Sequence, residues 1–217
     1  MVTDLEQLQR LQNRFTDDFS WSGTLQFHDS QTVSVLAKGG MAGSIHMRRI
    51  IPELRWKILR ADGDVRFDRC IVDSLQGAPS QIGRDLDILD CHNLTTLGGT
   101  FNTVGRDFSL KALDIKSLVG GPKFVGRNVS FKQLHKLESL EGFPTSVGGL
   151  VELDYNPHMG LLRTLVAKKV WLLGDEFQDK GRAVERILNK YAGKGRREMF
   201  WCQKDLEDAG FEENARW

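Results

Sequence analysis

The hydrophobic and polar positions of this chain repeat with a period of 21 to 22 residues between Ser74 and Leu162. One leucine column, with spacings of 22, 21 and 22 residues, comprises Leu75, Leu97, Leu118 and Leu140. An aliphatic residue followed by glycine repeats with the same spacings, as Ile82-Gly83, Val104-Gly105, Val125-Gly126 and Val147-Gly148. Four copies locked to one period predict a solenoid, in which each repeat forms one rung that stacks on its neighbours.

Each repeat begins with two apolar residues two positions apart, which is the pattern of a strand with one buried face. A third, corner position follows, and the sets are Val65, Phe67, Cys70; Leu86, Ile88, Cys91; Phe108, Leu110, Leu113; Val129, Phe131, Leu134; and Val151, Leu153, Asn156. A fourth column is Val72, Leu94, Ile115, Leu137 and Met159, and the leucine column continued to Leu162 is the fifth. We expect the glycine before each strand to form a tight turn with a positive φ.

The repeat extends beyond its clear copies. Leu25, Ile45 and Val65 follow glycines 20 residues apart and indicate degraded copies, and residues 169–173 indicate a last strand. The return segments contain Gly-Pro or Gly-Phe-Pro and are too short for a long helix, so we expect extended or single-turn returns. The prediction is a β-rich solenoid of about seven or eight rungs, each of 20 to 22 residues.

Helical periodicity marks both ends of the chain. Residues 4–15 place Leu5, Leu8, Leu11 and Phe15 on one face, which fits a helix that caps the first rung or, alternatively, binds a partner. Val184, Leu188 and Cys202 belong to two further helical faces that would close the other end. We therefore divide the chain into an N-terminal cap (1–18), a solenoid (19–174, degenerate over 19–73 and clear over 74–174) and a C-terminal helical cap (175–217), α+β by content.

Residues between two buried anchors face solvent, so the stacked rungs form an open strand face of the kind solenoids use for binding. One solvent-facing ladder reads Gln26, His46, Arg66, Asp87, Ser109, Ser130, Glu152 and Trp171. The next reads His28, Arg48, Asp68, Leu89, Lys111, Lys132, Asp154 and Leu173. The predicted partner-binding residues are Arg66, Asp68, Asp87, Ser109, Lys111, Ser130, Lys132, Glu152, Asp154 and Trp171.

Two features of these ladders leave alternatives open. Lys111 and Lys132 are adjacent like charges, which cost stability unless Asp68, Asp154 or a partner offsets them. Trp171 and Leu173 are either covered by the C-terminal helices or exposed as an interface anchor.

Composition narrows the class of protein. A net charge of +1 over 217 residues gives no global field that would attract nucleic acid or an anionic membrane. Three cysteines do not make a disulfide framework, the first residues have no apolar signal region, and no stretch is long enough for a membrane span. These features favour a cytoplasmic location.

No known catalytic, cofactor or metal signature occurs in the chain. Cys70 and Cys91 take equivalent positions in adjacent repeats, where we expect them to stack as buried apolar side chains rather than as metal ligands. We predict no catalytic residue, no cofactor and no metal. Residues 194–197 form a short basic loop, which is either a solvated turn or a contact for a phosphate or an acidic surface.

The repeat resembles the leucine-rich-repeat consensus, although an aliphatic-Gly turn replaces the leading Leu-x-x-Leu. The stretches SLEGFPTSVGGLVELDYNPHMGLLRTL and VERILNKYAGKGRREMFWCQKDLEDAGFEENARW resemble leucine-rich-repeat-like proteins encoded by tailed bacteriophages. The resemblance covers roughly residues 74–217. It implies a phage protein acting in the bacterial host cytoplasm and implies no particular activity.

The leading hypothesis is a non-enzymatic module that binds a host protein, such as a defence or regulatory protein, through the strand face. The alternative is nucleic-acid binding through Lys111, Lys132 and the loop 194–197, with affinity that falls steeply with salt. An enzyme is the third and least favoured hypothesis. The oligomeric state is open, because an uncapped rung edge could pair two chains.

Overall fold

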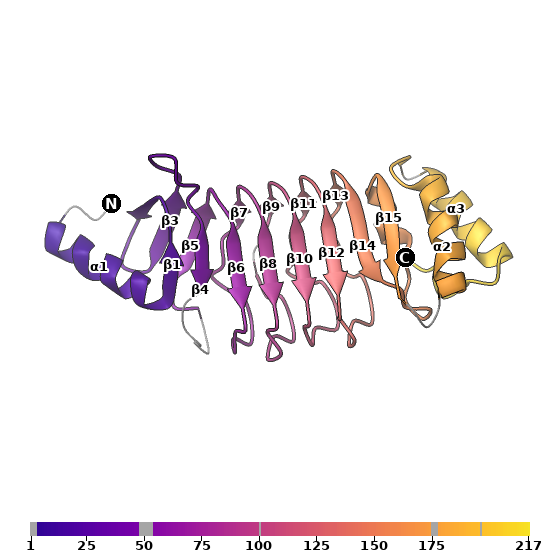
Figure 1. The fold of residues 1–217 in the computed structure, drawn as a ribbon, viewed down its shortest axis with the longest axis horizontal. Coiled ribbons are helices and arrows are strands. Elements are labelled where there is room, and N and C mark those ends of the chain that lie inside the picture. The colour runs from indigo at the N-terminus through magenta and orange to yellow at the C-terminus, as the bar shows by residue number, and fades with distance from the viewer. Residues whose placement is uncertain (1–3, 48–53, 100, 175–177, 196) are drawn as a thin grey trace.

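The computed structural model describes residues 4–47, 54–99, 101–174, 178–195 and 197–217. It is a β-solenoid of about six turns with stacked parallel strands, which confirms the predicted fold class. Figure 1 shows an elongated molecule with α1 (Leu5–Asp18) at its N-terminal end and α2 (Gln178–Tyr191) and α3 (Arg197–Asp208) at its C-terminal end. None of the helices among the described residues has the length and apolar character needed to cross a membrane.

Two sheets run side by side along the solenoid. The eight-stranded sheet consists, in spatial order, of β1 (Phe19–Trp21), β4 (Ile45–Met47), β6 (Val65–Asp68), β8 (Leu86–Leu89), β10 (Phe108–Lys111), β12 (Val129–Lys132), β14 (Leu150–Asp154) and β15 (Lys169–Leu173). The seven-stranded sheet consists of β13 (Ser146–Val147), β11 (Phe124–Val125), β9 (Thr103–Val104), β7 (Gln81–Ile82), β5 (Lys57–Ala61), β3 (Thr32–Leu36) and β2 (Thr24–Phe27). The returns are therefore extended, as predicted, and end in short strands.

The apolar columns of the sequence form one continuous core. Phe108 pairs in register with Leu86 on one side and Val129 on the other, so equivalent residues of successive rungs stack directly. Leucines of the fifth column, from Leu75 to Leu162, are all buried. Cys70 and Cys91 are buried in adjacent rungs, as predicted, and the side-chain contact with Cys91, followed by burial, raises the pKa of the Cys70 thiol.

The start of the solenoid differs from the prediction. Leu25 lies in β2, which pairs antiparallel with β3 in the seven-stranded sheet. The eight-stranded sheet begins instead with β1, which pairs antiparallel with β4. The first strand of each sheet, β1 or β2, is therefore antiparallel to its neighbour, although β3 already pairs parallel with β5, and the solenoid has fewer turns than the seven or eight expected.

Gly23 and Gly43, before β2 and β4, have the predicted positive φ, but the glycines before the strands of the clear repeats have a different role. Gly83, Gly105, Gly126 and Gly148 are absent from the residues with positive φ. They are needed because successive backbones approach closely there: a Cβ on Gly105 would lie 2.8 Å from the carbonyl carbon of Gly83, and one on Gly126 would lie 2.8 Å from that of Gly105. Positive φ occurs instead in the return segments, at Gly77, Gly98, Gly120 and Gly142.

A second column of left-handed residues follows the strands β6, β8, β10 and β12. The residues are not glycines, and all have φ between 52° and 56°: Arg69, Asp90, Ala112 and Gln133. Each lets the chain turn a corner, and the amide of Ala112 then donates to the carbonyl oxygen of Lys132 in the next rung at 3.1 Å. The left-handed conformation costs a residue with a Cβ about 1–2 kcal/mol.

We therefore expect Ala112→Gly to raise the free energy of unfolding by about 0.5–1 kcal/mol, because glycine adopts the left-handed conformation without steric strain. The larger backbone entropy that glycine loses on folding offsets part of this stabilisation. Urea unfolding followed by circular dichroism measures the change. The same substitution at Ala183, inside the C-terminal helix α2, should instead lower stability by about 1 kcal/mol. A lower free energy of unfolding for Ala112→Gly would show that the left-handed backbone of Ala112 is not strained.

Helices close both ends of the solenoid. Helix α1 (Leu5–Asp18) is N-capped by the Asp4 side chain and buries Phe15 against Phe19 and Trp56. The Trp56 indole nitrogen donates to Asp18 Oδ2 at 3.3 Å, which ties the helix to the return segment of the first rung. This packing matches the predicted cap.

The C-terminal cap consists of η1 (Leu162–Val166), α2 (Gln178–Tyr191) and α3 (Arg197–Asp208). Asn189 of α2 accepts from the Val170 amide at 2.8 Å and donates to the Val170 carbonyl oxygen at 2.7 Å, as a neighbouring strand would. Glu185 accepts from the Leu172 amide at 2.9 Å. These side chains occupy the outer edge of β15, which would otherwise offer a pairing edge to a second chain.

Candidate binding face

The candidate site is the outward surface of the eight-stranded sheet, which we call the strand face. The strand register stacks its first ladder in the predicted order from β4 to β15: His46, Arg66, Asp87, Ser109, Ser130, Glu152 and Trp171. In the second ladder, Lys111 lies between Leu89 and Lys132, Asp68 lies opposite Leu89, and Asp154 lies opposite Leu173. The ten predicted residues therefore lie on one sheet.

Two members of the predicted ladders do not join this face in the structure, and a third is not among the described residues. Gln26 lies in β2 and pairs with Ser34 in the other sheet, so its assignment to the first ladder was wrong. His28 follows the same strand, and its Nε2 lies 3.0 Å from the Ser34 hydroxyl. Both errors arise because β2 belongs to an antiparallel pair. The third residue, Arg48, lies outside the described residues.

The N-terminal half of the strand face carries a carboxylate without a close partner. Arg66 donates to Asp68 at 3.1 Å rather than to Asp87, whose side chain takes part in no hydrogen bond or ion pair between described residues. Burial raises the pKa of Asp87; Asp85 and Asp64 add to the increase, and Arg66 opposes it. Asp87 lies in a hollow of about 450 Å³ whose other walls include Ser20, Ser44 and His46.

The C-terminal half of the strand face carries a tight charge pair beside an exposed indole. Lys132 lies 2.8 Å from Glu152, and the Ser130 hydroxyl donates to the same carboxylate at 2.9 Å. Burial opposes the ionisation of Glu152, but Lys132 and Ser130 together lower its pKa. Glu152, and not Asp68 or Asp154, therefore pairs with Lys132, one of the two adjacent lysines.

Trp171 is 49% exposed next to Glu152, and Leu173 is half-buried. Helix α2 bonds the edge of β15 through Glu185 and Asn189 and leaves the outward face of that strand open. Of the two alternatives for Trp171, the structure thus supports the exposed position.

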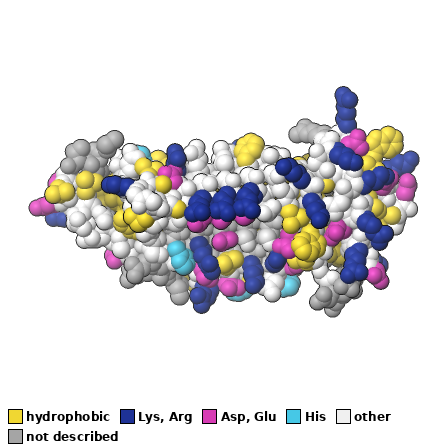
Figure 2. Space-filling model, turned by 45° about the horizontal axis from the view of Figure 1, so that its top comes forward, with side chains coloured by type: hydrophobic (Ala, Val, Ile, Leu, Met, Phe, Trp, Pro, Cys, Tyr) yellow, Lys and Arg dark blue, Asp and Glu magenta, His cyan; other side chains and the backbone are white. Residues whose placement is uncertain are grey.

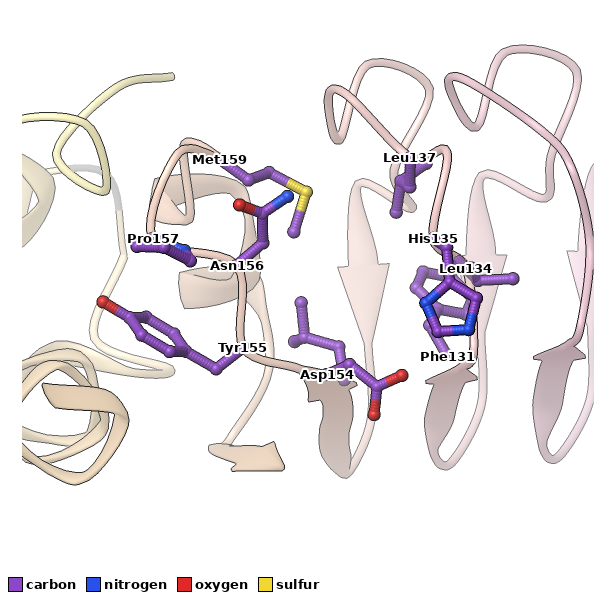
Figure 3. Close-up of a pocket in the computed structure, with 10 residues that line it drawn as sticks. Phe131, Leu134, His135, Leu137, Asp154, Tyr155, Asn156, Pro157 and Met159 are labelled. Carbon is purple, nitrogen blue, oxygen red and sulfur yellow. The ribbon is translucent and has the colours of Figure 1, made fainter. Parts of the chain in front are cut away.

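A small crevice opens at the corner after β12 and β14. Its volume is about 250 Å³, and its apolar walls include Phe131, Leu153 and Met159. Figure 3 shows His135 and Tyr155 on opposite sides of it, with Asp154 at its lower rim. Asn156 takes the corner position that leucine holds in the two preceding rungs, and its carbonyl oxygen bonds the C-terminal segment through Asn214. The corner after β14 is therefore bonded to the C-terminal segment.

A row of arginines at the rim of the strand face was not predicted. Arg84, Arg106 and Arg127 precede β8, β10 and β12 by two residues each. Figure 2 shows Lys and Arg side chains gathered in a row over the middle rungs. The sequence pattern that indicates this row is the tripeptide Gly-Arg-Asp or Gly-Arg-Asn, which occurs three times at the repeat period. We call these three side chains the arginine row.

The remaining candidate groups do not assemble into a site. Within the part of the chain that the structure describes, no three His, Cys, Asp or Glu side chains are arranged to hold a metal ion. In the basic loop, Lys194 and Arg197 are exposed, and Arg196 lies outside the described residues. Cys202 is buried in α3, where burial raises the pKa of its thiol to about 12.

Comparison of the chain with protein-family models, with curated proteins and with solved structures finds no match in any of the three.

Proposed function

We propose that this protein is a non-enzymatic binding module that takes a protein partner on the strand face. The observation that carries the proposal is the exposed indole of Trp171 at the end of a polar, mixed-charge sheet. Exposed tryptophans surrounded by polar groups are frequent anchors of protein interfaces. Trp171 and the Lys132–Glu152 pair lie on adjacent strands, so one partner could contact both.

The resemblance to proteins of tailed bacteriophages supports a partner from the bacterial host cytoplasm. A defence or regulatory protein of the host is the biological class we propose. The arrangement of charge supports a protein partner, because Asp68, Asp87, Glu152 and Asp154 share the strand face with Arg66, Lys111 and Lys132. A face of both signs would repel part of a phosphate backbone and can complement a protein surface of both signs.

Trp171→Ala is expected to weaken the partner's affinity about 30-fold, corresponding to about 2 kcal/mol for the loss of an interface anchor. Pull-down from host lysate, with the captured protein identified and its affinity then measured by calorimetry, gives the result. Trp201→Ala is the matched control, because Trp201 is 52% exposed on α3, away from the strand face.

A second variant tests the charged part of the same face. Arg66→Glu, Lys111→Glu and Lys132→Glu together reverse three positive charges and break the pairs with Asp68 and Glu152. Recovery of the partner should fall with this variant and with Trp171→Ala but stay unchanged with Trp201→Ala. A partner recovered equally by all four proteins would overturn the proposed function.

A further inference from the structure

The arginine row is a regular charged feature of the described surface. Arg106 donates its amide to the Arg84 carbonyl oxygen at 3.0 Å, and Arg127 donates to that of Arg106 at 2.9 Å. The three backbones are thus bonded rung to rung, and the side chains start from equivalent positions. Stacked like charges repel one another. In the two ladders of the strand face a residue type is kept over two rungs at most, as in Ser109 and Ser130 or Lys111 and Lys132, whereas this position is arginine three times in succession.

The guanidinium groups of the row are only loosely engaged. Each lies 3.8–3.9 Å from the carboxylate of Asp64, Asp85 or Asp107, beyond hydrogen-bond distance, and the side chains are 38–53% exposed. Between the described residues, no hydrogen bond from these three groups is formed. Arg66, by contrast, reaches its carboxylate at 3.1 Å. Each arginine therefore retains donors for a bidentate acceptor.

The aspartates beside the row already have a structural role. Asp64 Oδ1 accepts from the Asp85 amide at 3.3 Å, and Asp85 Oδ1 accepts from the Asp107 amide at 3.0 Å. Asp107 Oδ1 accepts from the Asn128 amide at 3.0 Å, and Asn128 continues the column to the Leu150 amide. These carboxylates bond successive rungs together, which explains why they stay at a distance from the guanidinium groups.

The spacing of the row distinguishes among possible acidic partners. Adjacent rungs are about 4.8 Å apart, so the outer arginines start about 9.6 Å apart. Carboxylates one turn apart on an α-helix rise about 5.4 Å per step, or about 10.8 Å over two steps. Carboxylates on one face of an extended strand rise about 6.7 Å per step, or about 13.4 Å over two. Flexible arginine side chains can adjust to the small difference between the row and a helix, but not readily to the larger difference between the row and an extended strand.

We propose that the arginine row binds an α-helix of a protein partner, laid along the solenoid axis with acidic residues at i, i+4 and i+7 facing the three guanidinium groups. This inference rests on the proposed function, because it names the chemistry of the protein partner. Nucleic acid fits less well, because a phosphate backbone is negative at every nucleotide, whereas a helix can turn neutral or basic side chains toward the aspartate column that lies 3.8–3.9 Å from the row.

The test uses the full chain and a fluorescent alanine-based helical peptide with glutamates at i, i+4 and i+7. A second peptide of the same composition carries them at i, i+5 and i+10, which spreads them around the helix, and a single-stranded oligothymidylate is the third probe. At low salt, anisotropy should show the first peptide binding most tightly. Arg84→Gln, Arg106→Gln and Arg127→Gln together should weaken it about tenfold.

The matched control changes three exposed arginines on the helices instead: Arg10→Gln, Arg182→Gln and Arg186→Gln. It alters net charge equally and should leave the affinity within about twofold. Equal binding of both peptides, tighter binding of the oligonucleotide, loss in the control variant, or no binding of any probe would each overturn the inference. Failure here leaves the Trp171→Ala result standing, because Trp171 lies on β15, outside the row.

Discussion

Gly105→Ala is expected to lower the free energy of unfolding by about 4 kcal/mol, among the largest effects of a single methyl group. The added Cβ would lie 2.8 Å from the carbonyl carbon of Gly83 and still closer to its oxygen. No side chain can rotate away, because the obstacle is backbone. The rungs would have to separate where the Gly105 amide donates to the Ile82 carbonyl oxygen at 2.8 Å.

Gly181→Ala is the matched control for this prediction. Gly181 lies in α2, and a Cβ there would meet the Tyr155 ring at 3.4 Å, an ordinary contact distance. Alanine favours the helix, so stability should stay unchanged or rise by up to about 1 kcal/mol. Urea unfolding of both variants compares the same added methyl in two settings. A Gly105→Ala protein within about 1 kcal/mol of the parent would show that the rungs can separate at little cost.

The periodic part of the fold could be predicted because burial repeats with the rung. Leu86, Phe108 and Val129 stack directly, and so a fixed sequence spacing reports a fixed place in the core. The first strands could not be placed this way. Leu25 has the expected 20-residue spacing from Ile45, yet it lies in an antiparallel hairpin of the other sheet. Spacing alone does not encode strand direction.

The role of the glycines depends on contacts between rungs. One repeat read alone presents Val104-Gly105 as a turn, whereas the close approach involves Gly83 in the rung before. Positive φ falls on Ala112 and its equivalents, residue types that give no sign of a left-handed corner. Both facts follow from stacking, which a local pattern does not describe.

The candidate face was predicted in part. Alternation along each strand placed Arg66, Lys111 and Glu152 outward, and the register agrees. The exposure of Trp171 depended on where α2 docks, which is decided by the bonds from Asn189 and Glu185 to β15. The arginine row precedes the strands, and the in-out alternation on which the prediction of the face depended applies only within a strand.

The second large effect is expected at Asn214, whose side chain is 1% exposed and joins the C-terminal segment to the last rung. Its Nδ2 donates to the carbonyl oxygens of Asn156 at 3.0 Å and Met159 at 2.9 Å, and its Oδ1 accepts from the Tyr155 hydroxyl at 3.0 Å. Asn214→Ala leaves three polar groups without this partner. We expect a loss of about 3 kcal/mol in the free energy of unfolding.

Two further variants separate hydrogen bonding from a general effect of the substitution. Asn93→Ala, at an exposed asparagine with one long bond of 3.4 Å to the Ile71 carbonyl oxygen, should change stability by less than about 0.5 kcal/mol. Tyr155→Phe removes one bond of the network and should cost about 1 kcal/mol. Because the two side chains share that bond, the Asn214→Ala, Tyr155→Phe double variant should lose less than the sum of the single losses. Strict additivity would mean that the Tyr155 hydroxyl contributes nothing through Asn214, and the effect of Asn214→Ala would then come from its bonds to the Asn156 and Met159 carbonyl oxygens.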